Sequence, residues 1–204
     1  MDTKYVQNNI ILQEAVTAKE IEQSTFDNIV LWQNNPELKD FHREINSLIE
    51  EKNFSALNDA FYNQIEFGTA GIRGRTGLGS ARINRWTIGA AAQGLATYIG
   101  SLGQEAKERG VVIGSDTRLT SPEFVSLVAD ILTSNGLKVY RFERPPQVGM
   151  FSYAVRLYKA QAGVYISASH NPPTDNGFKC YWEDGAQVLP PHDKAIIAAV
   201  KKVE

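Results

Sequence analysis

Polar side chains that could support nucleophilic or proton-transfer chemistry are concentrated in residues 167–179. This run holds two serines, a histidine, two asparagines and a lysine, among them Ser169, His170 and Lys179. A serine hydroxyl becomes a nucleophile when a neighbouring group takes its proton. On turn chemistry alone, the run is explained equally well as a polar turn fixed by prolines, in which Ser169 and Asn171 bond to local backbone. A Ser/His/Asp hydrolase site is the weaker interpretation, because adjacent serine and histidine side chains do not normally face each other and no Gly-x-Ser-x-Gly pattern is present.

A second segment, residues 65–75, combines glycines with arginines in the order Ile-Glu-Phe-Gly-Thr-Ala-Gly-Ile-Arg-Gly-Arg. Glycines spaced by two residues allow a ligand to approach the backbone closely, and Arg73 and Arg75 could meet phosphate. The spacing is neither a dinucleotide fingerprint nor a P-loop. We expect a loop here, and on spacing alone a loop without a ligand is as well supported as a phosphate site.

A third polar segment, residues 114–122, reads Gly-Ser-Asp-Thr-Arg-Leu-Thr-Ser-Pro. Ser121 and Pro122 have the residue types of a helix cap and of the first helical position. Asp116 and Arg118 could simply pair across the loop. Alternatively, Arg118 faces an anion, because a guanidinium suits phosphate.

Strand and helix patterns alternate after residue 80 and determine where these segments lie. Short apolar runs predict strands at residues 111–113, 138–142 and 163–167, with helical patterns between them. Such βαβαβ units form parallel sheets, and ligands gather beyond the carboxyl ends of the strands. We therefore predict an α/β fold, a three-layer αβα sandwich with a mostly parallel mixed sheet. Further along, Asp184-Gly185 predicts an antiparallel hairpin between residues 178–182 and 186–189.

Before residue 65 the sequence predicts short helices. Thr17 with Glu20 has capping-box spacing, and Asn35 before Pro36 marks a second helix start. Apolar residues then recur at helical spacing from Leu38 to Ile49. This amphipathic helix must dock on something, either as a brace on the main domain or as a partner-binding arm.

Composition excludes several classes of protein. The 204 residues are 43% hydrophobic and 22% charged, which is typical of a globular chain and not of a disordered or fibrous one. A net charge of -2 without a Lys/Arg run argues against a nucleic-acid partner. No apolar stretch approaches the roughly 20 residues of a membrane span, so we expect no membrane partner. The absence of a signal-peptide pattern and the single Cys180 favour the cytoplasm.

Taken together, the three polar segments resemble the first domain of the α-D-phosphohexomutase family. The motifs are Phe-Gly-Thr-Ala-Gly-Ile-Arg-Gly, Gly-Ser-Asp-Thr-Arg and Ser-Ala-Ser-His-Asn-Pro followed by Asn-Gly-Phe-Lys, starting at residues 67, 114, 167 and 176. Order and spacing match from Glu66 to about Pro191, and the helical prefix that ends in Ile65-Glu66-Phe67 is similar to that of the phosphoglucomutase and phosphopentomutase branch. The resemblance implies that residues 65–204 form the phosphoserine domain and that residues 1–64 are a helical extension packed on it.

The resemblance also implies roles for individual residues. Ser169 would carry a phosphoryl group, pass it to a sugar phosphate and recover one from a bisphosphorylated intermediate. Lys179 and His170 are candidates for proton transfer, with Lys179 preferred because a guanidinium such as that of Arg73 could lower its pKa. Arg73 would steady the phosphate, and Arg118, Asn171 and Lys179 would join it in binding substrate. Phosphoryl transfer requires positioning and charge neutralisation, which these residue types provide.

The family's remaining parts are not found in these 204 residues. A phosphoserine normally needs a divalent metal, so Mg²⁺ is expected, with one oxygen from phosphorylated Ser169. The resemblance implies that the other ligands belong to an Asp-Gly-Asp-Gly-Asp-Arg loop in a later domain, which the sequence does not contain. We expect a sugar 1,6-bisphosphate activator, a sugar-phosphate substrate and later domains of one parent chain as partners. Glucose is the first choice of sugar, ahead of mannose and ribose or deoxyribose, and the alternative is a stand-alone binding or regulatory domain without catalysis.

Overall fold

A computed structural model of the chain describes residues 3–68 and 71–203. The chain forms two compact units, Met1–Ile65 with Thr76–Asn84 and Glu66–Arg75 with Arg85–Glu204. We predicted that residues 1–64 form a helical extension and that residues 65–204 form the domain on which it packs. Both statements stay predictions. Within the described residues, no helix is both long and apolar enough to cross a membrane.

The first unit is helical. Its elements are α1 (Thr3–Thr17), α2 (Gln23–Asn34), the 3₁₀ turn η1 (Pro36–Leu38), α3 (Lys39–Glu50) and α4 (Phe54–Phe61). The Trp32 ring is buried against Phe61, with ring centroids 5.4 Å apart. Leu38, Ile45 and Ile49 are also buried, so the predicted amphipathic stripe faces this core.

One of the two predicted helix starts in this unit is confirmed and the other is wrong. The Asn35 side chain accepts a hydrogen bond from the Glu37 amide at the start of η1. Thr17 instead ends α1, where its hydroxyl donates to the Gln13 carbonyl one turn back. A threonine can bond to a carbonyl of its own helix as readily as cap the next one, and here the first bond forms.

The second unit is built on a five-stranded sheet with the order β1-β5-β4-β2-β3. The strands are β1 (Gly71–Arg75), β2 (Val111–Ser115), β3 (Val139–Arg141), β4 (Ala162–Ile166) and β5 (Asp175–Trp182). β2 is parallel to β3 and β4, whereas β5 is antiparallel to both β4 and β1. β1 therefore shares the direction of β4, and only β5 is reversed among the five.

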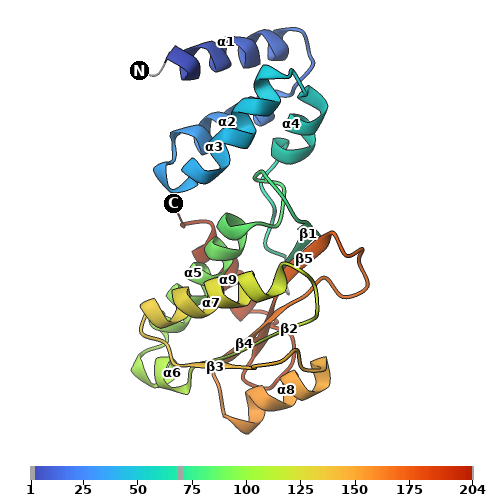
Figure 1. Ribbon diagram of the computed structural model, residues 1–204. Helices are drawn as coiled ribbons and strands as arrows, with labels where there is room; N and C mark the ends of the chain where they lie inside the picture. The colour runs from blue at the N-terminus through green and yellow to red at the C-terminus, as the bar shows by residue number, and fades with distance from the viewer. Residues whose placement is uncertain (1–2, 69–70, 204) are drawn as a thin grey trace. The chain divides into compact units, whose positions relative to one another are not determined.

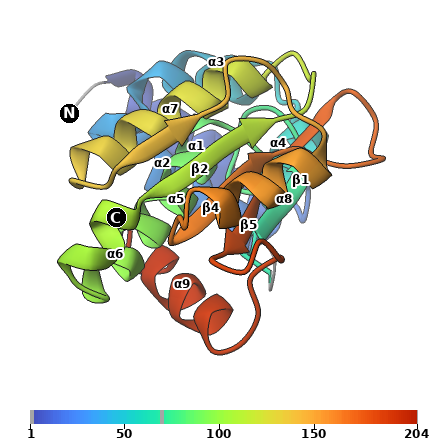
Figure 2. The same cartoon turned by 90° about the horizontal axis from the view of Figure 1, so that it is seen from below.

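Helices cover both faces of this sheet, as Figure 1 shows. They are α5 (Arg85–Ser101), α6 (Gln104–Arg109), α7 (Ser121–Ser134), α8 (Val148–Leu157) and α9 (His192–Val200). α5, α7 and α9 lie on one side and α8 on the other, and Figure 2 shows α8 lying along the strands. The predicted three-layer α/β fold with a mixed sheet and N-terminal helices is confirmed.

The predicted strands are found close to their expected limits, but one other expectation is wrong. Residues 71–75, expected in a loop, form edge strand β1, because β5 supplies backbone partners that local sequence does not reveal. The antiparallel hairpin predicted at Asp184-Gly185 is confirmed by a bridge between Tyr181 and Gln187, although its second arm is too short to form a strand of its own. The turn itself forms, and the Gly185 amide donates to the Trp182 carbonyl.

Phe151 of α8 is the centre of the core on its face of the sheet. The ring is fully buried and lies 4.9 Å from Tyr165 and 5.0 Å from Tyr181, centroid to centroid. A Cβ at Gly163 would come within 2.8 Å of this ring, and one at Gly114 within 2.9 Å. Glycine at both positions therefore gives the Phe151 ring its space against β2 and β4.

The opposite face of β5 carries the chain's single cysteine. Cys180 is fully buried, and this burial raises the pKa of its thiol to about 12. The cysteine is therefore a small apolar core residue at any physiological pH.

Phe151→Ala should lower the free energy of unfolding by about 3–5 kcal/mol, because the protein cannot fill the cavity left by a buried ring. Urea denaturation measures the change. Met150→Ala is the matched control on the same helix, since Met150 is 59% exposed. Equal losses in the two variants would contradict the placement of Phe151 at the centre of this core.

Candidate functional site

The polar segments after β2 and β4 lie together where the strand order reverses. After β2 the chain crosses to β3 at the edge of the sheet, and after β3 it returns to form β4 on the other side of β2. β2 and β4 are therefore neighbours, and the chain leaves their carboxyl ends in opposite directions across the sheet. Open α/β sheets bind ligands beyond the carboxyl ends of strands at such a point. The Asp116 amide donates to the Ile166 carbonyl over 3.1 Å and joins the two segments directly.

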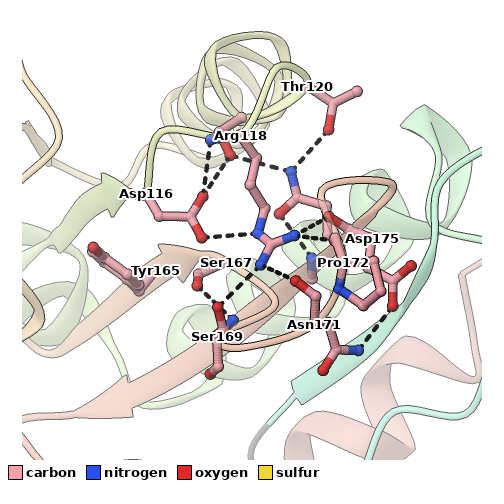
Figure 3. Close-up of polar contacts among 12 residues, drawn as sticks. Asp116, Arg118, Thr120, Tyr165, Ser167, Ser169, Asn171, Pro172 and Asp175 are labelled. Carbon is pink, nitrogen blue, oxygen red and sulfur yellow. Dashed lines mark hydrogen bonds and ion pairs between the residues drawn. The ribbon is translucent and has the colours of Figure 1, made fainter.

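Arg118 organises this edge, as Figure 3 shows. Its Nε donates to Asp116 Oδ2 over 2.9 Å. Its two terminal nitrogens donate to four backbone carbonyls over 2.5–3.0 Å, those of Ser169, Asn171, Pro172 and Asp175. Five N–H groups therefore meet five oxygens, and the loop between β4 and β5 is tied to the loop after β2.

These contacts bear on the two roles predicted for Arg118, an ion pair with Asp116 across the loop or a group that faces an anion. The ion pair with Asp116 forms, and the Arg118 side chain is only 10% exposed. Because each N–H of the guanidinium already has an acceptor, the contacts support a role in positioning the loop. Direct phosphate binding by Arg118 stays a prediction and would require one of these bonds to break.

Ser169 lies exposed at the tip of the tied loop with a backbone φ of 57°. This left-handed conformation costs a non-glycine residue on the order of 1 kcal/mol or more and persists only where neighbours enforce it. The Ser169 amide donates to Ser167 Oγ over 2.9 Å, and its carbonyl accepts from Arg118. The backbone is thus held on both sides while the hydroxyl stays accessible.

Lys179 reaches this hydroxyl from β5. Its Nζ donates to Ser169 Oγ over 2.5 Å. In the sheet Lys179 lies between Gly71 of β1 and Tyr165 of β4. Partial burial lowers the pKa of Lys179, the positive charges of Arg73 and Arg118 lower it further, and Asp116 opposes the shift. A larger fraction of this amine is therefore neutral near physiological pH than for an exposed lysine.

Arg73 projects from the same face of the sheet as Lys179. It pairs with Gly177, two residues from Lys179, so the two side chains occupy diagonal positions on neighbouring strands. Arg73 is exposed, and its guanidinium has no hydrogen bond or ion pair with residues 3–68 or 71–203. This cation is therefore available to an anion beside Ser169.

The remaining predicted residues differ in their placement. The Asn171 amide donates to Asp175 Oδ2 over 2.8 Å, so this side chain also holds the loop. His170 is exposed next to Ser169 and forms no hydrogen bond with the described part of the chain. The structure thus places Ser169 and Lys179 in contact, whereas it does not join His170 to either of them.

Sequence reasoning missed two supporting residues. Ser167, only 3% exposed, accepts the Ser169 amide, and a serine bonding to the amide two residues on is a known turn pattern that could have indicated this. Asn176 was interpreted as a turn residue, yet it is fully buried and bonds to Thr120 and Ser121. Nothing in the local sequence identifies those distant partners.

The expectation that Ser121 caps the next helix is wrong. Ser121 is the first residue of α7, and Thr120 occupies the cap position.

The described residues do not form a metal site by themselves. Within them, no three His, Cys, Asp or Glu side chains are grouped so that they could hold an ion. The Ser169 hydroxyl faces the Lys179 amine, and the Asp116 carboxylate is paired with Arg118. One hydroxyl beside a cation does not fit the oxygen-rich shell of Mg²⁺.

Comparison with known proteins yields a consistent set of relatives. Residues 64–204 match the family described as phosphoglucomutase/phosphomannomutase, alpha/beta/alpha domain I. The chain is 44% identical over 151 residues to a phosphoglucomutase of Staphylococcus epidermidis, covering 74% of this chain and 26% of that protein. It is 38% identical over 164 residues to the human phosphopentomutase, covering 78% and 27%. The chain thus spans about a quarter of the length of these curated relatives.

A solved structure shows the same fold. The crystal structure of a phosphomannomutase-type protein from Thermus thermophilus superposes with a TM-score of 0.61 at 32% identity. The superposition covers 68% of this chain and 30% of that one. The predicted resemblance to domain I is confirmed.

Arg118→Lys should loosen the loop that carries Ser169. One ammonium group cannot replace the bonds to Asp116 and four carbonyls, so amide hydrogen exchange in residues 169–175 should accelerate at least about tenfold. Arg141→Lys, at the exposed end of β3, is the control and should leave this exchange unchanged. Unchanged exchange in Arg118→Lys would show that the loop holds its own conformation.

Arg73→Met should raise the pKa of Lys179, because it removes a positive charge that disfavours the ammonium form. Nitrogen NMR titration of the lysine side chains measures the shift, with Lys179→Arg to assign the signal. Arg75→Met removes a charge from the same strand and should have the smaller effect. Equal effects would mean that the lysine senses only the overall charge of β1.

Proposed function

Because this chain belongs to the phosphoglucomutase/phosphomannomutase family, whose domain I it contains, we propose that it is the phosphoserine-bearing part of a sugar-phosphate mutase. The observation that supports this most directly is the 2.5 Å contact between Lys179 Nζ and Ser169 Oγ. The serine is exposed and its backbone is fixed, while the pKa of its lysine partner is lowered. These are the features of an activated hydroxyl at a site open to substrate.

In the proposed loading step, Ser169 Oγ attacks a phosphorus atom of a sugar bisphosphate. The bond from phosphorus to Oγ forms as the bond from phosphorus to the sugar oxygen breaks, and the neutral Lys179 amine takes the hydroxyl proton. The leaving sugar oxygen gains a proton, for which His170 is the nearest candidate in the loop. Transfer back to the sugar reverses each movement, and Lys179 then returns the proton to Oγ.

Charge neutralisation is the second requirement of this reaction. A phosphorylated Ser169 carries nearly two negative charges. Lys179 and Arg73 supply positive charges on the same face of the sheet, and Arg73 is available because it has no partner among the described residues. In this proposal Arg73 binds the phosphoryl group directly, whereas Arg118 and Asn171 hold the loop in which it forms.

The rest of the proposed enzyme lies outside this chain. Only about a quarter of each relative's length matches this chain, and the described residues do not fit Mg²⁺ alone. The metal ligands besides phosphorylated Ser169, the groups that select the sugar and the walls that exclude water would therefore come from later domains. Glucose phosphates are the first choice of substrate, ahead of mannose and pentose phosphates, with a sugar 1,6-bisphosphate as activator and the cytoplasm as the location.

A second candidate function rests on the same length comparison. A chain with only the domain I region could bind sugar phosphates or regulate a longer enzyme without catalysing a reaction. The two functions differ in whether Ser169 takes up a phosphoryl group.

Ser169→Ala should abolish both phosphoryl labelling and mutase turnover, because it removes the accepting oxygen. The measurement uses the longer protein that joins this chain to segments matching the rest of its relatives, with radiolabelled glucose 1,6-bisphosphate and Mg²⁺. Ser126→Ala, which alters a half-buried serine of α7 whose hydroxyl donates to the Pro122 carbonyl in its own helix, is the control and should keep both activities. Label retained on Ser169→Ala would refute the assignment, and binding without label on the unaltered protein would favour the regulatory function. The 204 residues alone should fold but not turn over glucose 1-phosphate.

A further inference from the structure

A buried amide at the start of β5 connects the segments that carry the reactive groups. Asn176 is fully buried and lies three residues before Lys179 in the same strand. We propose that Asn176 is a positioning residue that fixes Lys179 against Ser169. This inference rests on the proposed function for its purpose, but the geometry that it predicts can be tested without any catalysed reaction.

The contacts of Asn176 reach the start of α7. Its Nδ2 donates to Thr120 Oγ1 over 2.8 Å and to Ser121 Oγ over 3.1 Å. Its Oδ1 accepts the Gly177 amide over 2.8 Å. Both amide hydrogens and one oxygen lone pair are therefore used inside the core, where unpaired polar groups are costly.

From α7 the connection continues to the loop of Ser169. Ser121 Oγ donates to Asp116 Oδ1 over 3.2 Å, and Asp116 is the carboxylate that pairs with Arg118. Arg118 in turn binds the carbonyls around Ser169. A chain of hydrogen bonds thus runs from the strand of Lys179 through Ser121, Asp116 and Arg118 to the nucleophile.

A second connection is shorter. The Gly177 carbonyl accepts the Ser167 amide over 3.0 Å, and Ser167 Oγ accepts the Ser169 amide. Asn176 Oδ1 holds the amide of Gly177, and the carbonyl of the same residue starts this connection. Asn176 therefore lies in the strand of Lys179 and is linked by hydrogen bonds to the loop of Ser169, the other member of the 2.5 Å pair.

The amide group is required because it both donates and accepts. An aspartate at this position would only accept, so the Thr120 and Ser121 hydroxyls would have to donate to it. Ser121 would then lose its bond to Asp116, and a second negative charge would lie near the site. Alanine would remove the bonds that the Thr120 and Ser121 hydroxyls accept, leave the Gly177 amide without its acceptor and loosen the start of β5.

Both substitutions should change the titration of Lys179. Asn176→Asp adds a negative charge that favours the ammonium form, and Asn176→Ala loosens the strand that holds Lys179 in its partly buried position, so both should raise the pKa of Lys179, by roughly one pH unit. Nitrogen NMR titration on the 204-residue chain measures the shift. Asn84→Ala is the matched control, since Asn84 is a buried asparagine of the first unit whose amide also makes two donations. It should lower stability without moving Lys179.

An unchanged Lys179 titration in Asn176→Ala and Asn176→Asp, with a loss of unfolding free energy like that of Asn84→Ala, would overturn the proposal and leave Asn176 as a core residue only. If neither variant folds, Thr120→Val removes one acceptor of the same amide and should raise the pKa of Lys179 by less, and no shift would again overturn the proposal. Failure of the proposed function is a separate result. It would appear as an unaltered longer protein whose Ser169 takes no label.

Discussion

Four backbone carbonyls and one carboxylate converge on the guanidinium of Arg118, and the loop that presents Ser169 depends on this arrangement. The loop between β4 and β5 contains two prolines and forms no regular ladder, so its carbonyls need partners from elsewhere. The planar, rigid guanidinium of Arg118 donates hydrogen bonds to all four carbonyls, which the single ammonium group of a lysine could not do. The left-handed backbone of Ser169 is maintained because its neighbours are fixed in this way.

The reversed direction of β5 explains how a serine and a lysine ten residues apart come into contact. A parallel strand after β4 would need a crossover of about a dozen residues or more, which would move Lys179 away from the loop. An antiparallel return uses only residues 167–174 and brings β5 back beside β4. Lys179 then pairs with Tyr165, close to the end of β4, within reach of the hydroxyl. Topology therefore provides the contact, and the hydrogen bonds of Asn176 and Arg118 refine it.

Sequence patterns predicted the elements whose signals are local. The parallel strands β2, β3 and β4 are short apolar runs between helices, and the site motifs lie at their ends, so both could be found from the residues. β1 could not, because Gly71 and Gly74 weaken its strand pattern and its partner β5 is a hundred residues away. Thr17 shows the same limit, because its hydroxyl could either cap a following helix or donate to a carbonyl of its own helix, and the local sequence does not distinguish the two. In the site, Ser169 and Lys179 followed from their motifs, whereas the inward amide of Asn176 depends on tertiary contacts with α7.

The burial of Cys180 has a consequence for the surroundings in which this edge can work. Oxidants and metals that attack sulfur react with exposed thiolates, and this thiol is neither exposed nor ionised. It neighbours Lys179 in the chain but faces the other side of the sheet. With no other cysteine in the sequence, the reactive edge relies on oxygen and nitrogen groups alone. An oxidant that acts on thiolates therefore finds no exposed cysteine in these 204 residues.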